Sequence, residues 1–166
     1  NGLVSLGRAG ANVTFISEVG GDRVGDIILN FMKDNGISTD NVKVYPDRKS
    51  PISLAFLNEK NDAEYSFYKD YPSLRLDVDM PEVTSEDIVM FGSFYAITPQ
   101  LRDKVKELLD KAREAGAIIY YDVNFRSTHA HEAIKLMPTI LENFEYADIV
   151  RGSNEDFGYM FGMTDA

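Results

Sequence analysis

The sequence predicts an α/β fold with a doubly wound, mostly parallel sheet into which one antiparallel β-hairpin is inserted. Short apolar runs alternate three times with segments in which apolar residues recur at helical spacing, and this alternation is typical of parallel sheets whose strands are joined by helices. One stretch, residues 52–68, breaks the alternation with two strand-like runs around a polar turn, which is typical of an antiparallel hairpin. With 166 residues, the chain is long enough to bury the core of one domain.

The first helix–strand step runs from Asp22 to Val44 and follows a strand predicted at residues 13–19. Gly36 stands where the end of a helix favours a left-handed residue. The helix itself is predicted from apolar residues at helical spacing, namely Val24, Ile27, Ile28, Phe31 and Met32.

The inserted hairpin has strands at residues 52–57 and 63–68 and a polar turn at residues 58–62. An inserted hairpin commonly serves as a lid over a site or as a contact between subunits. The alternative is an ordinary extension of the sheet. We take the lid strands to span about residues 45–70.

The second step begins with a buried strand at residues 87–91, which Gly92 and Ser93 end. Thr98 and Pro99 have the pattern of a helix N-cap followed by proline at the first helical position. The apolar stripe of the next helix contains Leu101, Val105, Leu108, Leu109 and Ala112, and the helix closes at Gly116 before a strand at residues 117–121.

The third step repeats this pattern and ends in a short strand at residues 148–150 and a helix at about residues 154–161. Pro138 predicts a kink in the helix between the two strands. The predicted stripe of that helix contains Ala133, Ile134, Met137, Ile140, Leu141 and Phe144.

Composition excludes several classes of protein. The net charge is −10 and the sequence pI about 4.6, which argues against nucleic acid as a partner because its phosphates require a basic surface. No apolar run approaches the roughly 20 residues that span a bilayer, and no signal peptide is recognisable. The chain has no Cys, which excludes thiolate catalysis and zinc–thiolate sites in it. We therefore expect a cytoplasmic protein.

An acid, an amide and a cation occupy alternate positions immediately after the strand at residues 117–121. They are Asp122, Asn124 and Arg126. Ligands of parallel sheets bind beyond the carboxyl ends of the strands, and alternate side chains of an extended chain share one face. The acid and the amide suit sugar hydroxyls, and Arg126 suits a carboxylate or a phosphate. The segment predicts a wall of a site for a small polar metabolite; the alternative is a structural Asp–Arg pair that holds the loop.

Two further segments have patterns that suit a ligand. Residues 20–25 place three glycines and Asp22 between a strand and a helix start, where backbone amides could hold an anion; a turn with an Asp cap explains them at least as well. Tyr68 and Lys69 lie beside other aromatic residues at the end of the hairpin. Aromatic faces with a cation suit a sugar or a sugar acid, and the alternative is packing between strands.

These segments, in this order, resemble the ribokinase-like, PfkB-type carbohydrate kinases over nearly the whole chain, and most closely the fructokinase and 2-keto-3-deoxygluconate kinase members. Residues 1–10 resemble the family helix that begins with a sugar-contacting Asn. Residues 19–25 match the signature Val-Gly-x-Asp-x-x-Gly. Residues 53–56 and 65–69 resemble the lid strands, residues 91–93 the strand end beneath the sugar, and residues 122–126 match Asp-x-Asn-x-Arg.

The resemblance implies a kinase that uses ATP and Mg²⁺ to phosphorylate a sugar hydroxyl, with the hairpin as its lid and a possible homodimer through that lid. It implies that Ser153 lies at the nucleotide phosphates and Asp156 at the metal. The residues that it implies on the sugar side are Asn1, Asp22, Tyr68, Lys69, Asp122, Asn124 and Arg126.

The chain departs from the family pattern in two places. After the strand at residues 148–150 the family usually has Lys and then Asn-x-x-Glu, whereas this chain has Arg151, Ser153 and Asp156. The Gly-Ala-Gly-Asp segment, which supplies the family's anion hole and catalytic base, does not occur in these 166 residues. We therefore expect an internal portion of a kinase, without the first strand, the C-terminal nucleotide part or any catalytic residue, and without turnover of its own.

Fructokinase activity is the first expectation for the whole protein. A kinase for 2-keto-3-deoxygluconate is the second, because Lys69 leaves both a neutral ketose and a sugar acid open. The third is a non-catalytic relative that senses a sugar or a nucleotide, and the Ser at position 153 motivates it. The expected ligand is in each case a small molecule, with neither nucleic acid nor membrane as partner.

Overall fold

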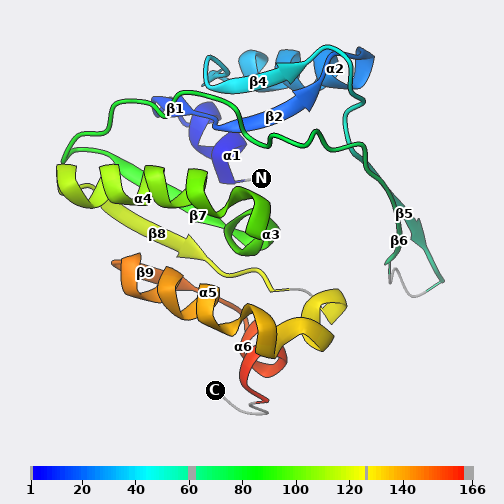
Figure 1. Cartoon of the computed structure of the whole chain (residues 1–166). Helices are drawn as coiled ribbons and strands as arrows, with labels where there is room; N and C mark the ends of the chain where they lie inside the picture. Colours follow the sequence, from blue (N-terminus) through cyan, green and yellow to red (C-terminus); the bar gives the residue numbers. More distant parts are fainter. Residues whose placement is uncertain (1, 60–62, 126, 163–166) are drawn as a thin grey trace. The chain divides into compact units, whose positions relative to one another are not determined.

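The computed structural model describes residues 2–59, 63–125 and 127–162. The chain divides into two compact units, Asn1–Met80 and Pro81–Ala166, and each contains helices and strands in alternation (Figure 1). No helix among the described residues is long and apolar enough to cross a membrane.

The first unit contains two short parallel ladders and the hairpin. Strand β1 (Val13–Thr14) pairs with β3 (Ile37–Ser38), and β2 (Ser17–Gly20) pairs with β4 (Val42–Tyr45). The single strand predicted at residues 13–19 is therefore two strands that belong to different ladders. Two helices complete this part of the unit, α1 (Gly2–Arg8) and α2 (Arg23–Asp34). Helix α2 agrees with the prediction, and Gly36 has the left-handed φ of +75° that was expected of it.

The hairpin has the predicted strands, β5 (Ile52–Leu57) and β6 (Ala63–Tyr68), paired antiparallel from Ile52↔Tyr68 to Leu57↔Ala63 (Figure 1). All six side chains of β5 are exposed. In an antiparallel pair, residues directly opposite one another share a face. One face therefore holds Ile52, Leu54, Phe56 and Tyr68, and the other holds Leu57, Tyr65 and Phe67, so that both faces are apolar.

The second unit is built on a three-stranded parallel sheet in the order β7 (Ile88–Gly92), β8 (Ile118–Asp122) and β9 (Ile149–Arg151). The connections are helices, as predicted. Helix α3 (Ser93–Ile97), the 3₁₀ turn Pro99–Leu101 and α4 (Arg102–Ala115) join β7 to β8. The 3₁₀ turn Ser127–Glu132 and α5 (Ala133–Tyr146) join β8 to β9, and α6 (Asn154–Phe161) follows.

The core of the second unit lies between the sheet and its helices. Tyr121 is fully buried, stacks on Phe91 with ring centroids 4.8 Å apart, and meets Phe144 at 5.7 Å. The buried residues around it are Ala96, Ile97, Val123, Phe125, Ala133, Leu136, Ile140 and Met160. On the opposite face of the sheet, Ile88 and Ile118 are exposed. Within this unit the helices thus cover one face of the sheet, and the described strands of the chain pair in separate ladders.

Two local predictions were wrong, and a third was confirmed only in position. Ser93 does not end a strand but begins α3, a helix that the sequence did not predict. Thr98 is the N-cap residue of the 3₁₀ turn and Pro99 is its first residue, as predicted, but the Thr98 hydroxyl donates to the carbonyl of Phe94 at 2.6 Å and caps no N–H of the turn. Ile134 is 93% exposed, because the buried stripe of α5 runs through Leu136 and Asn143.

Asn143 explains why that stripe was misread. It is fully buried although it is polar. Its amide nitrogen donates to the carbonyl of Ala96 at 3.1 Å, and its oxygen accepts from Arg102 at 2.6 Å. The two hydrogen bonds offset the cost of removing the amide from water, so a hydrophobic pattern alone could not identify this face.

Candidate functional site

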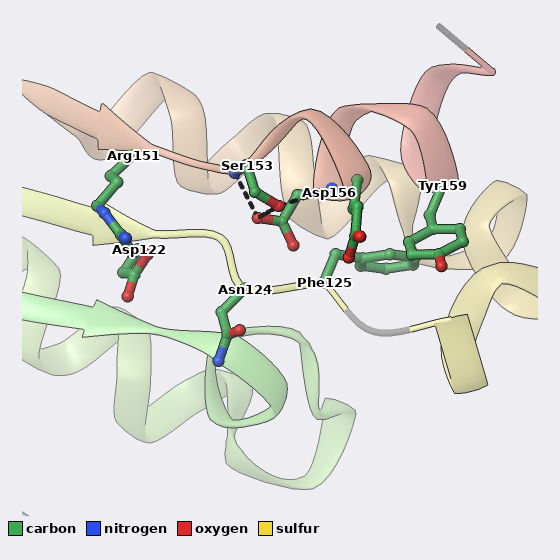
Figure 2. A pocket seen from close by; sticks show the side chains of 8 residues that line it. Asp122, Asn124, Phe125, Arg151, Ser153, Asp156 and Tyr159 are labelled. Carbon is green, nitrogen blue, oxygen red and sulfur yellow. Dashed lines mark hydrogen bonds and ion pairs between the residues drawn. The ribbon is translucent and has the colours of Figure 1, made fainter. Parts of the chain in front are cut away.

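A pocket of about 300 Å³ lies at the carboxyl ends of β8 and β9 (Figure 2). This is the edge at which ligands of parallel sheets bind. Its lining comes from the end of β8, the end of β9 and the first turns of α6, and consists of Asp122, Asn124, Phe125, Arg151, Ser153, Glu155, Asp156 and Tyr159.

Asp122 and Arg151 meet because the register of the parallel strands places them opposite one another. A guanidinium nitrogen of Arg151 donates to Asp122 Oδ1 at 3.0 Å. The hydrogen bond and the charge of Asp122 raise the pKa of Arg151. The side chain of Arg151 is 67% exposed, so the pair is weakly held and either group can turn to a ligand.

Asn124 is held in an unusual backbone conformation, with φ of +42°. Its amide nitrogen donates to the hydroxyl of Ser93 at 3.2 Å, and Ser93 itself has φ of +54°. Non-glycine residues with positive φ are uncommon and concentrate at functional sites. Figure 2 shows the Asn124 side chain turned toward the ribbon of β7 and α3.

Ser153 and Asp156 form a capping box at the start of α6. The Ser153 hydroxyl accepts from the Asp156 backbone N–H at 3.2 Å, and Asp156 Oδ2 accepts from the Ser153 backbone N–H at 2.6 Å and from its hydroxyl at 2.9 Å. The box satisfies helix N–H groups that would otherwise lack partners. The second carboxylate oxygen of Asp156 points away from Ser153 (Figure 2).

The donor set of this pocket suits a Mg²⁺ ion that is shared with phosphates. Asp122, Glu155 and Asp156 supply carboxylate oxygens, the ligands that Mg²⁺ prefers. Among residues 2–59, 63–125 and 127–162, no three His, Cys, Asp or Glu side chains are placed to form a complete metal cage.

Asp22 lies in the first unit, at the N-cap of α2. Its carboxylate accepts hydrogen bonds from the backbone N–H of Gly25 at 2.9 Å, from the hydroxyl of Ser50 at 2.8 Å and from the backbone N–H of Ser50 at 3.0 Å. The geometry favours the second of the two interpretations of residues 20–25, a turn with an Asp cap.

Tyr68 and Lys69 also lie in the first unit. Tyr68 is 61% exposed and shares the hairpin face of Ile52. The ammonium group of Lys69 lies 5.0 Å from the ring centroid of Phe67, whose side chain belongs to the other face. The two predicted site residues are thus adjacent in sequence but are directed differently.

The structure brings four of the predicted site residues into one pocket: Asp122, Asn124, Ser153 and Asp156. Asn1 and Arg126 lie outside the described residues. The other four pocket residues were not predicted as site residues; they are Phe125, Arg151, Glu155 and Tyr159. Arg151 could have been predicted because the strand that it ends pairs in parallel with the strand that ends at Asp122. Tyr159 could have been predicted because it lies about one helical turn after Asp156 on α6.

Comparison with solved structures defines the class of protein. A fructokinase from Xylella fastidiosa, also solved with bound ATP, matches 96% of this chain and 50% of its own with a TM-score of 0.74 at 21% identity. A sugar kinase from Pyrococcus horikoshii matches 96% of this chain and 53% of its own, with a TM-score of 0.79 at 24% identity. At these identities the likeness establishes a ribokinase-like α/β fold, as predicted.

Residues 1–166 match the family model of the pfkB family carbohydrate kinases, and the chain belongs to this family. The Arabidopsis thaliana protein named "Probable fructokinase-6, chloroplastic" is 28% identical over 165 residues, which cover 96% of this chain and 43% of that protein. Fructokinase-2 of Solanum habrochaites is 24% identical over 172 residues, 99% of this chain and 51% of that protein. The chain spans about half the length of the curated relatives it matches.

Proposed function

We propose that the protein containing this chain is an ATP-dependent sugar kinase that transfers the γ-phosphoryl group of ATP to a hydroxyl of fructose. The observation that carries the proposal is the pocket at the ends of β8 and β9, where groups expected at the sugar (Asp122, Asn124) and at the phosphates and metal (Ser153, Asp156) line one cavity. Phosphoryl transfer depends mainly on such positioning and on neutralising charge. Membership of the family and the relatives named fructokinases support the choice of reaction and sugar.

In this proposal the sugar contacts Asp122 and Asn124, whose oxygens accept hydrogen bonds from hydroxyls. Arg126, Asn1, Tyr68 and Lys69 complete the sugar side, as the family resemblance implies. Asp156 would hold Mg²⁺, and the N-terminus of α6 with Ser153 would receive phosphate oxygens. The ion would neutralise charge on the transferring phosphoryl group.

Two other activities remain candidates, each favoured by a particular observation. Arg151 places a cation inside the pocket, which favours an acidic substrate such as 2-keto-3-deoxygluconate. The mutual capping of Ser153 and Asp156 engages both side chains within the protein, which favours a relative that binds a sugar or nucleotide without chemistry.

The test uses the full-length protein with ATP, Mg²⁺ and a panel of fructose, ribose and 2-keto-3-deoxygluconate. We expect ADP release with fructose, and a loss of about tenfold or more in turnover in Asp156→Asn, which keeps a cap oxygen but loses the charge that holds Mg²⁺. Asp77→Asn, at an exposed ion pair with Lys43 in the first unit, is the matched control and should retain activity.

Each outcome distinguishes between the candidates. Phosphorylation of the sugar acid alone would replace fructose as the substrate. A thermal shift with sugar or nucleotide, but without ADP release, would establish the sensor. The absence of both binding and turnover would overturn the proposal.

We further propose that the hairpin acts as a lid and as a contact between two copies, in a cytoplasmic homodimer. A two-stranded hairpin is marginal in water unless another surface covers it, and both faces of this one expose aromatic residues. The face of Tyr68 would cover the sugar and exclude water, which competes as phosphoryl acceptor. The face of Tyr65 and Phe67 would then meet the partner copy.

A further inference from the structure

The root of the hairpin, residues 48–50 immediately before β5, is tied to the turn between β2 and α2. Ser50 is only 4% exposed. Both its hydroxyl and its backbone N–H donate to Asp22, and its hydroxyl accepts from the backbone N–H of Gly20 at 3.0 Å. The same carboxylate therefore caps α2 through Gly25 and holds the first strand of the hairpin.

The glycines of this turn are required by close approaches of the backbone, and Gly20 by its contact with the hairpin root itself. A Cβ on Gly20 would lie 2.4 Å from the backbone nitrogen of Ser50, and one on Gly21 would lie 2.6 Å from the Cα of Pro46. A Cβ on Gly25 would meet the carbonyl oxygen of Gly20 at 2.2 Å. These distances are far below van der Waals contact, so the motif at residues 19–25 allows the hairpin root to pack directly on the turn.

A second carboxylate holds the root from the other strand. Asp70, two residues after β6, accepts from the guanidinium of Arg48 at 3.2 Å and from the backbone N–H of Lys49 at 3.1 Å. Two carboxylates therefore bind three consecutive residues. Asp70, after the end of the hairpin, binds Arg48 and Lys49. Asp22, at the N-cap of α2, binds Ser50.

We propose that Asp22 and Asp70 are positioning residues that together fix the orientation of the hairpin at its root, and that Asp22 acts on the sugar only through the hairpin. The effect on sugar binding rests on the proposed kinase function and on the hairpin as its lid. The anchor itself rests on the geometry of residues 48–50. All three described hydrogen bonds of the Asp22 carboxylate are made to backbone or side-chain groups of Gly25 and Ser50.

Asp22→Asn separates capping from anchoring. Asn is as good an N-cap as Asp, and its oxygen can replace Asp22 Oδ1, which accepts from Gly25 and from the Ser50 hydroxyl. Its amide nitrogen then replaces Oδ2 and faces the Ser50 N–H, so that two donors oppose each other. Asp70→Ala removes the acceptor of both the Lys49 backbone N–H and the Arg48 guanidinium, with no change to α2.

The experiment is hydrogen exchange resolved to single amides on the full-length protein, without sugar. We expect the Ser50 amide to exchange about tenfold or more faster in Asp22→Asn, and the Lys49 amide likewise in Asp70→Ala. The α2 amides and the paired amides of β5 and β6 should keep their protection in both variants. Asp77→Asn is the control and should change none of these rates.

Sugar binding, measured as KM and kcat separately, gives the second readout. Both anchor variants should raise KM for the sugar several-fold with a smaller change in kcat, although Asp70 was never expected to touch sugar. Unchanged exchange of Ser50 in a folded Asp22→Asn protein would overturn the proposal. So would a rise in KM in Asp22→Asn while Asp70→Ala has none, because Asp22 would then be a sugar ligand.

The exchange results also separate this inference from the proposed function. If the wild-type protein neither binds nor phosphorylates sugar, the kinase proposal fails. The exchange rates of the Lys49 and Ser50 amides still test whether Asp70 and Asp22 hold the hairpin root. If Asp22→Asn fails to fold, Ser50→Ala replaces it: loss of the hydroxyl bond should accelerate local exchange of the Gly20 amide, and an unchanged rate would contradict the anchor.

Discussion

At the scale of single residues, Gly92 and Gly116 are both glycines by necessity, but for different physical reasons. Gly116 ends α4 with a left-handed φ of +74°, and a Cβ there would have only ordinary contact, with its nearest neighbour 3.9 Å away. Gly92 has extended backbone. A Cβ on Gly92 would lie 1.9 Å from the carbonyl oxygen of Asp122, which is impossible without moving the strand ends apart.

Gly92→Ala should therefore destabilise the second unit more than Gly116→Ala. We expect a loss of about 3 kcal/mol for the overpacked site and about 1 kcal/mol for the left-handed one. Urea denaturation followed by circular dichroism measures both. Equal losses would show that β7 and β8 can separate at no cost, and that the close approach does not shape the pocket.

The sequence predicted that Asp122 lies at the end of a strand, but it did not predict which side chains Asp122 contacts. A buried run followed by an acid identifies a strand end from local pattern alone. The pairing of Asp122 with Arg151 depends instead on the register of strands about 30 residues apart, which tertiary packing decides. The left-handed conformation of Ser93 and Asn124 is likewise invisible locally, because neither is a glycine.

At the scale of elements, the segment that returns from the hairpin is held by a buried ion pair. Glu18 on β2 accepts from the guanidinium of Arg75 and from the backbone N–H of Leu76. The Glu18 and Arg75 side chains are 5% and 6% exposed. Arg75 also lies over the ring of Tyr71, 3.8 Å from its centroid.

Glu18→Gln should cost about 3–5 kcal/mol of folding free energy, because it leaves the buried Arg75 charge without a counter-charge. Chemical denaturation of the full-length protein, monitored by amide exchange in residues 13–80, measures this. Lys43→Gln, which breaks the exposed pair with Asp77, is the control and should shift the midpoint far less. A loss in Glu18→Gln no larger than in the control would mean that water reaches Arg75.

The anchor of the hairpin should depend on pH. The backbone N–H of Gly25, then the hydroxyl of Ser50, lower the pKa of Asp22 below 3.8, with Lys49 as the nearby charge. The backbone N–H of Lys49, then Arg48, lower the pKa of Asp70 below 3.8. For carboxyls whose pKa is lower in the folded state, the stabilisation is complete above pH 3.8 and is lost as the pH falls through the folded value.

We therefore expect the exchange of the Lys49 and Ser50 amides, corrected for intrinsic rates, to keep its protection down to about pH 3.8 and to lose it below. Titration of the carboxyl carbons by NMR should give midpoints below 3.8 for both acids. A midpoint at or above 3.8 for either would contradict the hydrogen bonds described for it.

Some helices and strands could be predicted from the sequence pattern and others could not. The hairpin strands and α6 have the predicted bounds, because turn residues delimit each of them clearly. Helix α3 was not predicted because Gly92 and Ser93 are residue types typical of turns. In the folded chain a helix begins at Ser93 instead, because tertiary contacts override the local preference. Ile134 and Leu141 were assigned to a buried stripe that in fact includes a fully buried amide, Asn143.

At the scale of the whole molecule, the residues expected at the sugar are distributed over both units. Tyr68 and Lys69 belong to the first, and Asp122 and Asn124 to the second. The hairpin exposes three aromatic side chains, Phe56, Tyr65 and Phe67, at 55–57%. Such a surface is expected to be buried against another protein surface.

Burial of one hairpin face in a homodimer predicts a specific effect of mutation on association. Tyr65 and Phe67 stack at 6.0 Å on the face opposite Tyr68. Replacing both by Ser should remove much of the apolar area at such a contact. We expect the full-length protein to sediment as a dimer, and the double variant to dissociate at concentrations about tenfold or more higher than the wild type does.

Ile134→Ser, at the most exposed large apolar residue of the described chain, controls for a general loss of hydrophobic surface and should leave the dimer intact. Replacing Ile52 and Leu54 on the other face should raise KM for the sugar and spare association, because that face is proposed to cover the substrate. Sedimentation velocity across a range of concentrations separates the two faces. A wild-type monomer at all concentrations, or loss of the dimer only when the Ile52 face is changed, would overturn the assignment of the faces.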